Sequence, residues 1–182
     1  MTCIVAIEHE GKVWMGGDSA ACKDDYVSSV KNKKVFIVDD FIIGYSGSFR
    51  VGQILEYAFK PPKQDIYSKS DMEYMVIDFV DSLRETLREK GVLLNTEEGE
   101  SHDSEFLVGY HGQIYSIERD FHVGRSMHRY TACGSGMYYA LGALHTLDED
   151  IDAPPLLKIE KALSACIAFS TNVRAPFVIM SL

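Results

Sequence analysis

The stretch TCIVAIEHEGKVWMGGDS, residues 2–19, contains two short apolar runs, Thr2–Glu8 and Lys12–Gly16, on either side of Glu10-Gly11. Apolar runs of this length that flank a turn-forming pair are typical of β-strands. Glycine suits the reversal because it adopts backbone angles that other residues avoid. The stretch therefore predicts a β-hairpin that begins at the second residue.

A second predicted hairpin follows, with apolar runs at Lys34–Val38 and Phe41–Tyr45 joined by two aspartates. We therefore expect four strands in the first quarter of the chain. After Gly47 the apolar residues recur at helical spacing until Pro61-Pro62, where proline ends the helix.

The strongest helical pattern begins at Ser70 and ends near Gly91. Ser70 and Glu73 have the spacing of a capping box, in which each side chain accepts from the other residue's backbone N–H. The apolar residues that follow fall on one helical face, and we expect them in the core. They are Met72, Met75, Val76, Phe79, Val80, Leu83 and Leu87.

The second half of the chain also places strands before helices. We expect an acidic solvated loop at Asn95–Glu105, followed by a hairpin of Phe106–Tyr110 with Gln113–Glu118. Two helices are expected next, at Gly134–His145 and Leu156–Phe169, and a closing strand at Phe177–Leu182. Helices grouped between antiparallel hairpins favour an α+β fold, with two sheets face to face and helices outside them. The length fits one domain, residues 1–182.

Composition narrows the function classes. Apolar residues make up 46% of the chain, which is enough for a sizeable core and excludes a disordered polymer. The net charge of −9 argues against a nucleic-acid partner. The four cysteines are too sparse for a disulfide scaffold, so we expect reduced thiols. The sequence has no apolar run that could span a membrane and no signal-peptide pattern, so we expect a cytoplasmic protein.

Several familiar catalytic motifs are incomplete or absent in this sequence. The segment Gly44–Ser48 has the start of a G-x-S-x-G nucleophile elbow, but a serine stands where the last glycine is needed. Ser28–Lys31 has the form S-x-x-K without the partner motifs that would support it. The six histidines include no H-E-x-x-H zinc pattern. We expect neither a metal nor a cofactor.

Thr2 offers a different nucleophile. Threonine is small enough that methionine aminopeptidase normally removes a preceding Met1, which would leave Thr2 with a free α-amino group. An α-amine with a pKa of about 7.7 to 8.0 is partly neutral at physiological pH and can accept the hydroxyl proton. Such a nucleophile needs a nearby cation, an acid that holds the cation and a backbone donor for the oxyanion. Asp18, Lys34 and the Gly47 amide are candidates for these roles.

The motifs that carry these residues resemble those of the proteasome β-subunit and HslV peptidase family, which belongs to the N-terminal nucleophile hydrolases. They are Thr2–Ile7, Gly16–Ser19, Lys34–Phe36, Gly44–Gly47 and Gly134–Gly136. The separations of Asp18 and Lys34 from Thr2 match those of the family. The resemblance covers essentially the whole chain and implies a four-layer αββα sandwich.

The resemblance also implies roles and partners. Thr2 would be the nucleophile, Lys34 the cation that lowers its pKa, Asp18 the partner of Lys34, the Gly47 amide the oxyanion donor, and Ser135 the residue that assists the terminal amine. It implies a threonine-type peptidase in a homo-oligomeric ring, six- or seven-fold, that acts on peptides or unfolded proteins, with an ATP-dependent unfoldase as an expected further partner.

The chain departs from the family at one place. Family members carry a further aspartate on the last long helix, whereas Ala165–Thr171 contains no acid. Ser170 is our candidate for a hydrogen-bonding substitute there. Two alternatives to the peptidase stay open. One is a non-catalytic ring-forming subunit of the same fold, and the other is a hydrolase of small amides.

Overall fold

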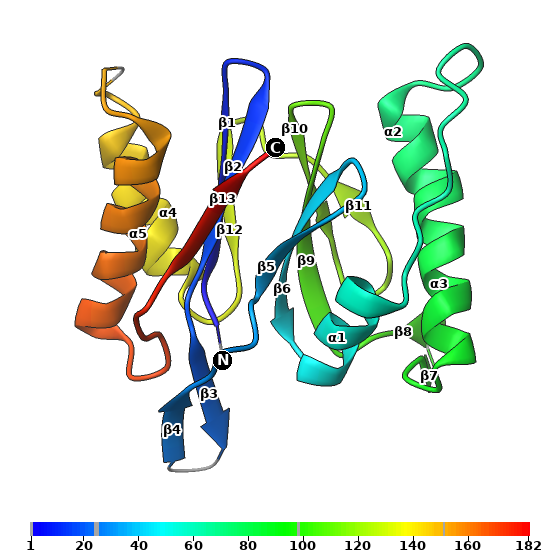
Figure 1. Cartoon of the computed structure of the whole chain (residues 1–182), viewed down its shortest axis with the longest axis horizontal. Coiled ribbons are helices and arrows are strands. Elements are labelled where there is room, and N and C mark those ends of the chain that lie inside the picture. Colours follow the sequence, from blue (N-terminus) through cyan, green and yellow to red (C-terminus); the bar gives the residue numbers. More distant parts are fainter. Residues whose placement is uncertain (1, 24–25, 98, 151) are drawn as a thin grey trace.

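Two antiparallel sheets lie face to face between two layers of helices in the computed structural model, which describes residues 2–23, 26–97, 99–150 and 152–182 (Figure 1). The predicted fold class, α+β with a four-layer αββα sandwich, is confirmed. No helix in these ranges is both long and apolar enough to cross a membrane.

The first sheet has the strand order β12-β1-β2-β13. Its strands are β1 (Ile4–His9), β2 (Lys12–Gly17), β12 (Tyr130–Cys133) and β13 (Val178–Ser181). Helices α4 (Met137–Leu147) and α5 (Pro155–Phe169) cover its outer face (Figure 1). The predicted first hairpin is confirmed, and its turn residues Glu10 and Gly11 have φ values of 49° and 73°. Gly11 adopts the left-handed backbone conformation, which glycine reaches without the steric cost that other residues meet.

The second sheet has the order β11-β10-β9-β6-β5. Its strands are β5 (Val35–Val38), β6 (Phe41–Gly47), β9 (Ser104–Tyr110), β10 (Gln113–Ile117) and β11 (Val123–Gly124). The other helix layer packs on it (Figure 1). That layer consists of α1 (Phe49–Tyr57), α2 (Asp71–Tyr74), the π-helical turn η1 (Met75–Phe79) and α3 (Val80–Glu89).

A buried apolar layer joins the two sheets. It contains Ile4, Ala6, Val13 and Met15 from the first sheet and Val35, Ile42, Leu107 and Ile114 from the second. Burying an aliphatic side chain of this size contributes about 1.5 to 3 kcal/mol. This layer holds β1 and β2 against β5 and β6, and the ends of these four strands carry the candidate site residues.

The long helix differs from its prediction in one respect. The capping box of Ser70 and Glu73 is present, but the helix contains the π-helical turn η1. A π turn uses more residues than an α turn, so it rotates the preceding residues around the axis. Tyr74 therefore points inward, whereas Met72 and Val76 are 39% and 45% exposed, and their predicted place in the core is wrong.

Three further predictions need correction. The first quarter of the chain contains a further hairpin, β3 (Ala20–Lys23) with β4 (Tyr26–Ser29), which projects from one end of the sandwich (Figure 1). The β11 and β12 strands were not predicted. The segment Asn95–Glu105 is not simply a loop, because β7 (Leu94–Thr96) and β8 (Gly99–Ser101) form a hairpin within it.

An ion-pair cluster explains the β7–β8 hairpin. The Glu100 carboxylate accepts hydrogen bonds from Arg84 at 2.7 Å and from Arg88 at 2.9 Å, and both arginines lie on α3. The arginines also lower the pKa of Glu100 through these hydrogen bonds. Charge pairing with the helix that precedes the hairpin in the chain thus accompanies strands that no apolar pattern indicated.

Candidate active site

A buried ion pair joins Asp18 and Lys34. Asp18 follows β2, Lys34 precedes β5, and the Lys34 Nζ atom donates to Asp18 Oδ1 at 2.9 Å. Both side chains are at most 1% exposed. The Tyr45 N–H donates to the Lys34 carbonyl at 3.0 Å, which ties the residue to β6. The ion pair therefore links the end of the first sheet to the beginning of the second.

The Asp18 carboxylate also binds backbone N–H groups. Cys3 donates to Oδ1 at 3.0 Å, and Ala20 and Arg174 donate to Oδ2 at 2.8 Å and 3.4 Å. Buried carboxylates are stable in the charged form only when donors surround them in this way. Because Cys3 follows Thr2, Asp18 connects the Lys34 ammonium directly to the backbone at the candidate nucleophile.

Burial acts on Lys34 as well. It lowers the pKa of Lys34 from the ordinary lysine value, and the neighbouring Asp18 carboxylate opposes that change. The Nζ atom also lies 5.9 Å from the centre of the Phe49 ring at the start of α1. The result is an amine in an environment of low polarity, where it acts strongly on any nearby charge.

Thr2 and Ser135 are in direct contact. The Thr2 N–H donates to Ser135 Oγ at 3.3 Å, while the Thr2 carbonyl accepts from Gly136 N at 3.2 Å and from Ser135 Oγ at 3.4 Å. Thr2 is 4% exposed. Met1, whose removal the prediction requires, lies outside the described residues.

Gly47 ends β6 at the surface, with φ of 110°, a value that favours glycine. Its neighbour Ser46 reaches toward the Thr2 side of the site. A Cβ atom on Gly134 would lie 2.7 Å from Ser46 Oγ and 2.4 Å from the Thr2 carbonyl oxygen. The structure thus joins Thr2 to Ser135, and Asp18 to Lys34 and to the Cys3 N–H, through hydrogen bonds. Gly47 is connected to this set through its neighbour Ser46, whose Oγ approaches Gly134.

Gly134 gives a direct test of this packing. With φ of 87° and the Thr2 carbonyl so close, Gly134→Ala should displace Thr2 and slow any reaction there by about a hundredfold, the usual effect of a 1 Å misplacement. Gly142→Ala in α4 is the control, because nothing lies within 4 Å of its Cβ position. That change should stabilise the protein by about 0.5 to 1 kcal/mol in urea unfolding. Equal effects of the two changes on reactivity would contradict this account of Gly134.

The last part of α5 packs against Cys3, the neighbour of Thr2, and this is the segment in which the chain has no acid, unlike the family that its motifs resemble. Cys166 Sγ lies 3.4 Å from Cys3 Sγ, and the Cys166 thiol donates to the Gly136 carbonyl at 3.3 Å. The hydrogen bond between the two thiols and burial raise the pKa of the Cys3 thiol, so Cys3 stays protonated and packs rather than reacts. Ser170 accepts from Asn172 N at 3.3 Å and makes no described contact with Thr2.

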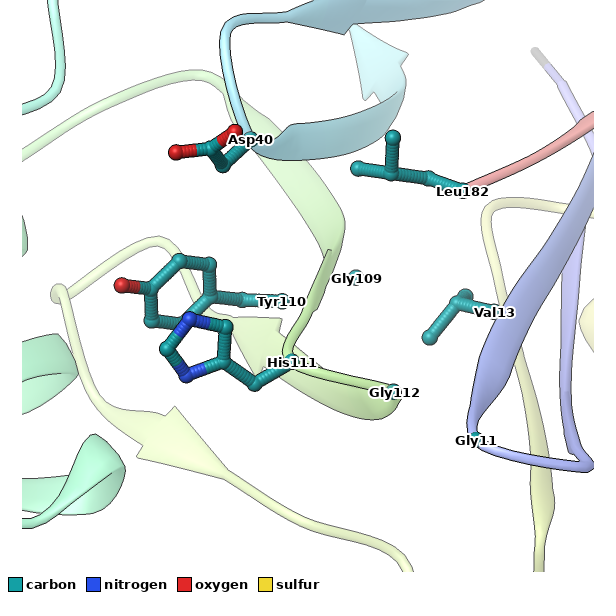
Figure 2. A pocket seen from close by; sticks show the side chains of 8 residues that line it. All are labelled: Gly11, Val13, Asp40, Gly109, Tyr110, His111, Gly112 and Leu182. Atoms are coloured by element: carbon teal, nitrogen blue, oxygen red, sulfur yellow. The ribbon is translucent and has the colours of Figure 1, made fainter.

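A pocket at the other end of the sandwich is separate from this site. It has a volume of about 410 Å³ and lies between the β1–β2 turn, the β5–β6 turn, the β9–β10 turn and Leu182. Figure 2 shows Asp40, Tyr110 and His111 along one side and Val13 and Leu182 along the other. His111 already pairs with Asp71 at 3.1 Å. Within the described ranges, no three His, Cys, Asp or Glu side chains gather as a metal site.

The sequence patterns missed several residues that build the site. Arg174 and Ala20 contribute through backbone N–H groups, which any residue type provides. Ser46 has no predicted role, yet its hydroxyl would lie 2.7 Å from a Cβ atom on Gly134. No local pattern marks Arg174 and Ser46, because their partners are distant in the sequence, whereas Ala20 binds Asp18 through a backbone group that carries no residue signature.

No protein-family model and no curated protein sequence matches the chain. Solved structures do. BPH from Thiobacillus denitrificans, in complex with epoxomicin, has a TM-score of 0.83 at 21% identity, with 100% of this chain and 98% of BPH covered. HslV from Trypanosoma brucei has a TM-score of 0.76 at 17% identity, with 100% and 99% covered.

Anbu, an ancestral β-subunit from Yersinia bercovieri, has a TM-score of 0.67 at 13% identity, with 99% of this chain and 81% of Anbu covered. The resemblance stated from the motifs is thus confirmed at the level of the fold. The chain has the same αββα fold as BPH, HslV and Anbu.

Proposed function

We propose that this chain is a threonine-dependent amide hydrolase that cleaves peptides, with Thr2 as its nucleophile once Met1 has been removed. One observation carries the proposal. The buried Asp18 carboxylate accepts hydrogen bonds both from Lys34 and from the backbone N–H next to Thr2. A charge pair that is costly to bury is thereby placed at the residue whose terminus would become reactive.

Acylation starts with a proton transfer within Thr2. The free α-amine accepts the hydroxyl proton, and Oγ attacks the carbonyl carbon of the substrate. The Lys34 ammonium favours the developing alkoxide and the neutral amine by its positive charge. Ser135 Oγ, the present hydrogen-bond partner of the Thr2 nitrogen, orients that amine.

The tetrahedral intermediate then needs a donor for its oxyanion, and the Gly47 amide is our candidate. Collapse breaks the C–N bond, and the leaving amine takes the proton that the Thr2 amine received. An ester between Thr2 Oγ and the acyl group remains. Water hydrolyses it by the same steps in reverse order, with the α-amine again as the base.

We further propose that the chain forms a homo-oligomeric ring, works in the cytoplasm on peptides or unfolded proteins, and receives them from an ATP-dependent unfoldase. Both helix layers expose apolar side chains that support assembly. Those on α2, η1, α4 and α5 include Met72, Val76, Ile77, Tyr138, Leu156 and Phe169. The BPH structure in complex with epoxomicin supports peptide-like ligands for this fold.

Intact mass tests the proposal without knowledge of the substrate. We expect the natively expressed protein to lack Met1 and to gain one adduct when treated with a peptide epoxyketone. Because this electrophile reacts with an amine and a hydroxyl together, a single adduct at Thr2 reports a free terminus and an activated Oγ. Retained Met1 and no adduct would contradict the proposal.

The non-catalytic assembly subunit is the second candidate. It is favoured by the end of α5, where Cys166 packs against Cys3 and no acid faces Thr2. A stable ring in native mass spectrometry, combined with retained Met1, would support this role. A ring whose subunits all carry the epoxyketone adduct would exclude it.

A further inference from the structure

The beginning of β9 packs directly against the Gly47 turn. Ser104 stands opposite Gly47 in the β6–β9 register. The Ser48 N–H, which belongs to the peptide after Gly47, donates to the Asp103 carbonyl at 3.0 Å and to Ser104 Oγ at 3.1 Å. Ser104 Oγ in turn donates to the Asp103 carbonyl at 2.7 Å. One hydroxyl and one carbonyl therefore hold the peptide that follows Gly47.

This contact leaves no free space at Gly47. A Cβ atom there would lie 2.4 Å from the Asp103 carbonyl oxygen and 2.8 Å from Ser104 Cα. The two backbones therefore touch, and the direction of the Gly47 amide depends on where residues 103 and 104 lie. Ser48 adds a second restraint, because its Oγ accepts from Val51 N and caps α1.

The segment before Ser104 is itself firmly anchored. His102 is 1% exposed, and its ring stacks on Phe106 and meets Phe121 edge-on, each with 4.7 Å between ring centres. Its backbone N–H donates to the Arg119 carbonyl at 3.0 Å. Burial lowers the pKa of His102 to about 4, so the ring is neutral near pH 7. The Gly47 turn thus rests on a rigid part of the second sheet.

We propose that Ser104 is a positioning residue for the proposed reaction. Its buried hydroxyl holds the Ser48 N–H in the peptide that follows Gly47, and this restraint on the turn keeps the preceding Gly47 amide in the direction needed for the oxyanion. Ser104 is 0% exposed, so its hydroxyl is held entirely within the protein. The inference rests on the proposed function. It assigns to Ser104 an effect on the transition state and none on substrate affinity.

The experiment compares Ser104→Ala with Ser101→Ala, a half-buried serine on β8 outside the site. Each protein reacts with a peptide aldehyde, whose addition creates an oxyanion, and with a peptide vinyl sulfone, whose addition does not. We expect Ser104→Ala to slow aldehyde addition and kcat by about tenfold or more, with KM and the vinyl sulfone rate unchanged. Loss of an entire oxyanion donor lowers kcat by about 100- to 1000-fold, and this range is the upper limit for the effect of Ser104→Ala.

The outcomes separate this inference from the function beneath it. If the wild type reacts with neither probe, the proposed function fails. If the wild type reacts and Ser104→Ala slows both probes equally, or neither, the function stands and the positioning role of Ser104 is wrong. Should Ser104→Ala fail to fold, Ser104→Cys keeps the size and a weaker hydrogen-bonding group, and it should show the same selective loss to a smaller degree.

Discussion

Thr2→Ala should abolish the epoxyketone adduct and lower peptide hydrolysis by at least about a thousandfold, the scale seen when a catalytic nucleophile is removed. Alanine retains the α-amine but has no Oγ to attack a carbonyl. Initiator methionine is removed before alanine as well, so the terminus stays comparable. Rates on a broad peptide library, with termini verified by mass, measure the effect.

Two further variants make this result specific. Thr2→Ser keeps a hydroxyl and an amine on the same residue and should retain measurable adduct formation. Thr131→Ala removes a threonine from β12, which pairs with β1, and should change neither adduct nor rate. Equal hydrolysis by Thr2→Ala and the wild type would show that the nucleophile lies elsewhere.

Lys34→Met should lower the free energy of unfolding by about 3 to 5 kcal/mol, the usual effect of breaking a buried ion pair. Asp18 would then keep a buried charge with no ammonium beside it. The matched control is Lys69→Met. It removes a lysine whose pairing with Asp78 is about one-third exposed, and it should cost about 0 to 1 kcal/mol. Urea unfolding of both variants measures the difference.

A double-mutant cycle separates the two halves of the pair. Asp18→Asn with Lys34→Met removes both charges, so it should recover part of the stability that Lys34→Met loses. It should recover none of the reactivity, because the ammonium that we propose acts on Thr2 is still missing. Recovery of epoxyketone reactivity in the double variant would show that Lys34 supports only the fold.

The site residues stay a prediction, whereas several of the surrounding elements were missed. Thr2, Asp18 and Lys34 were identified from the chemistry that an N-terminal nucleophile needs and from motif separations that resemble those of the family. Ser104 could not be found in this way, because its role depends on the β6–β9 register. The β7–β8 hairpin was missed because Glu100 is stabilised by arginines on α3, and composition alone indicated a solvated loop.

The long helix shows a different limit of sequence patterns. Helical spacing placed Met72 and Val76 in the core, but the π turn η1 rotates them outward. Spacing rules assume a uniform number of residues per turn. They therefore fail wherever packing of residues such as Tyr74 makes one turn wider.

The division of the candidate site between two sheets makes the proposed enzyme latent until it has folded completely. A partly folded chain with only β1 and β2 in place would hold Asp18 near Thr2 without the Lys34 ammonium, and with no Gly47 turn in position. Its threonine would be an ordinary, weakly nucleophilic hydroxyl. Such a chain would not cleave neighbouring nascent chains, because it would gain hydrolase activity only when the two sheets pack together through the apolar layer between them.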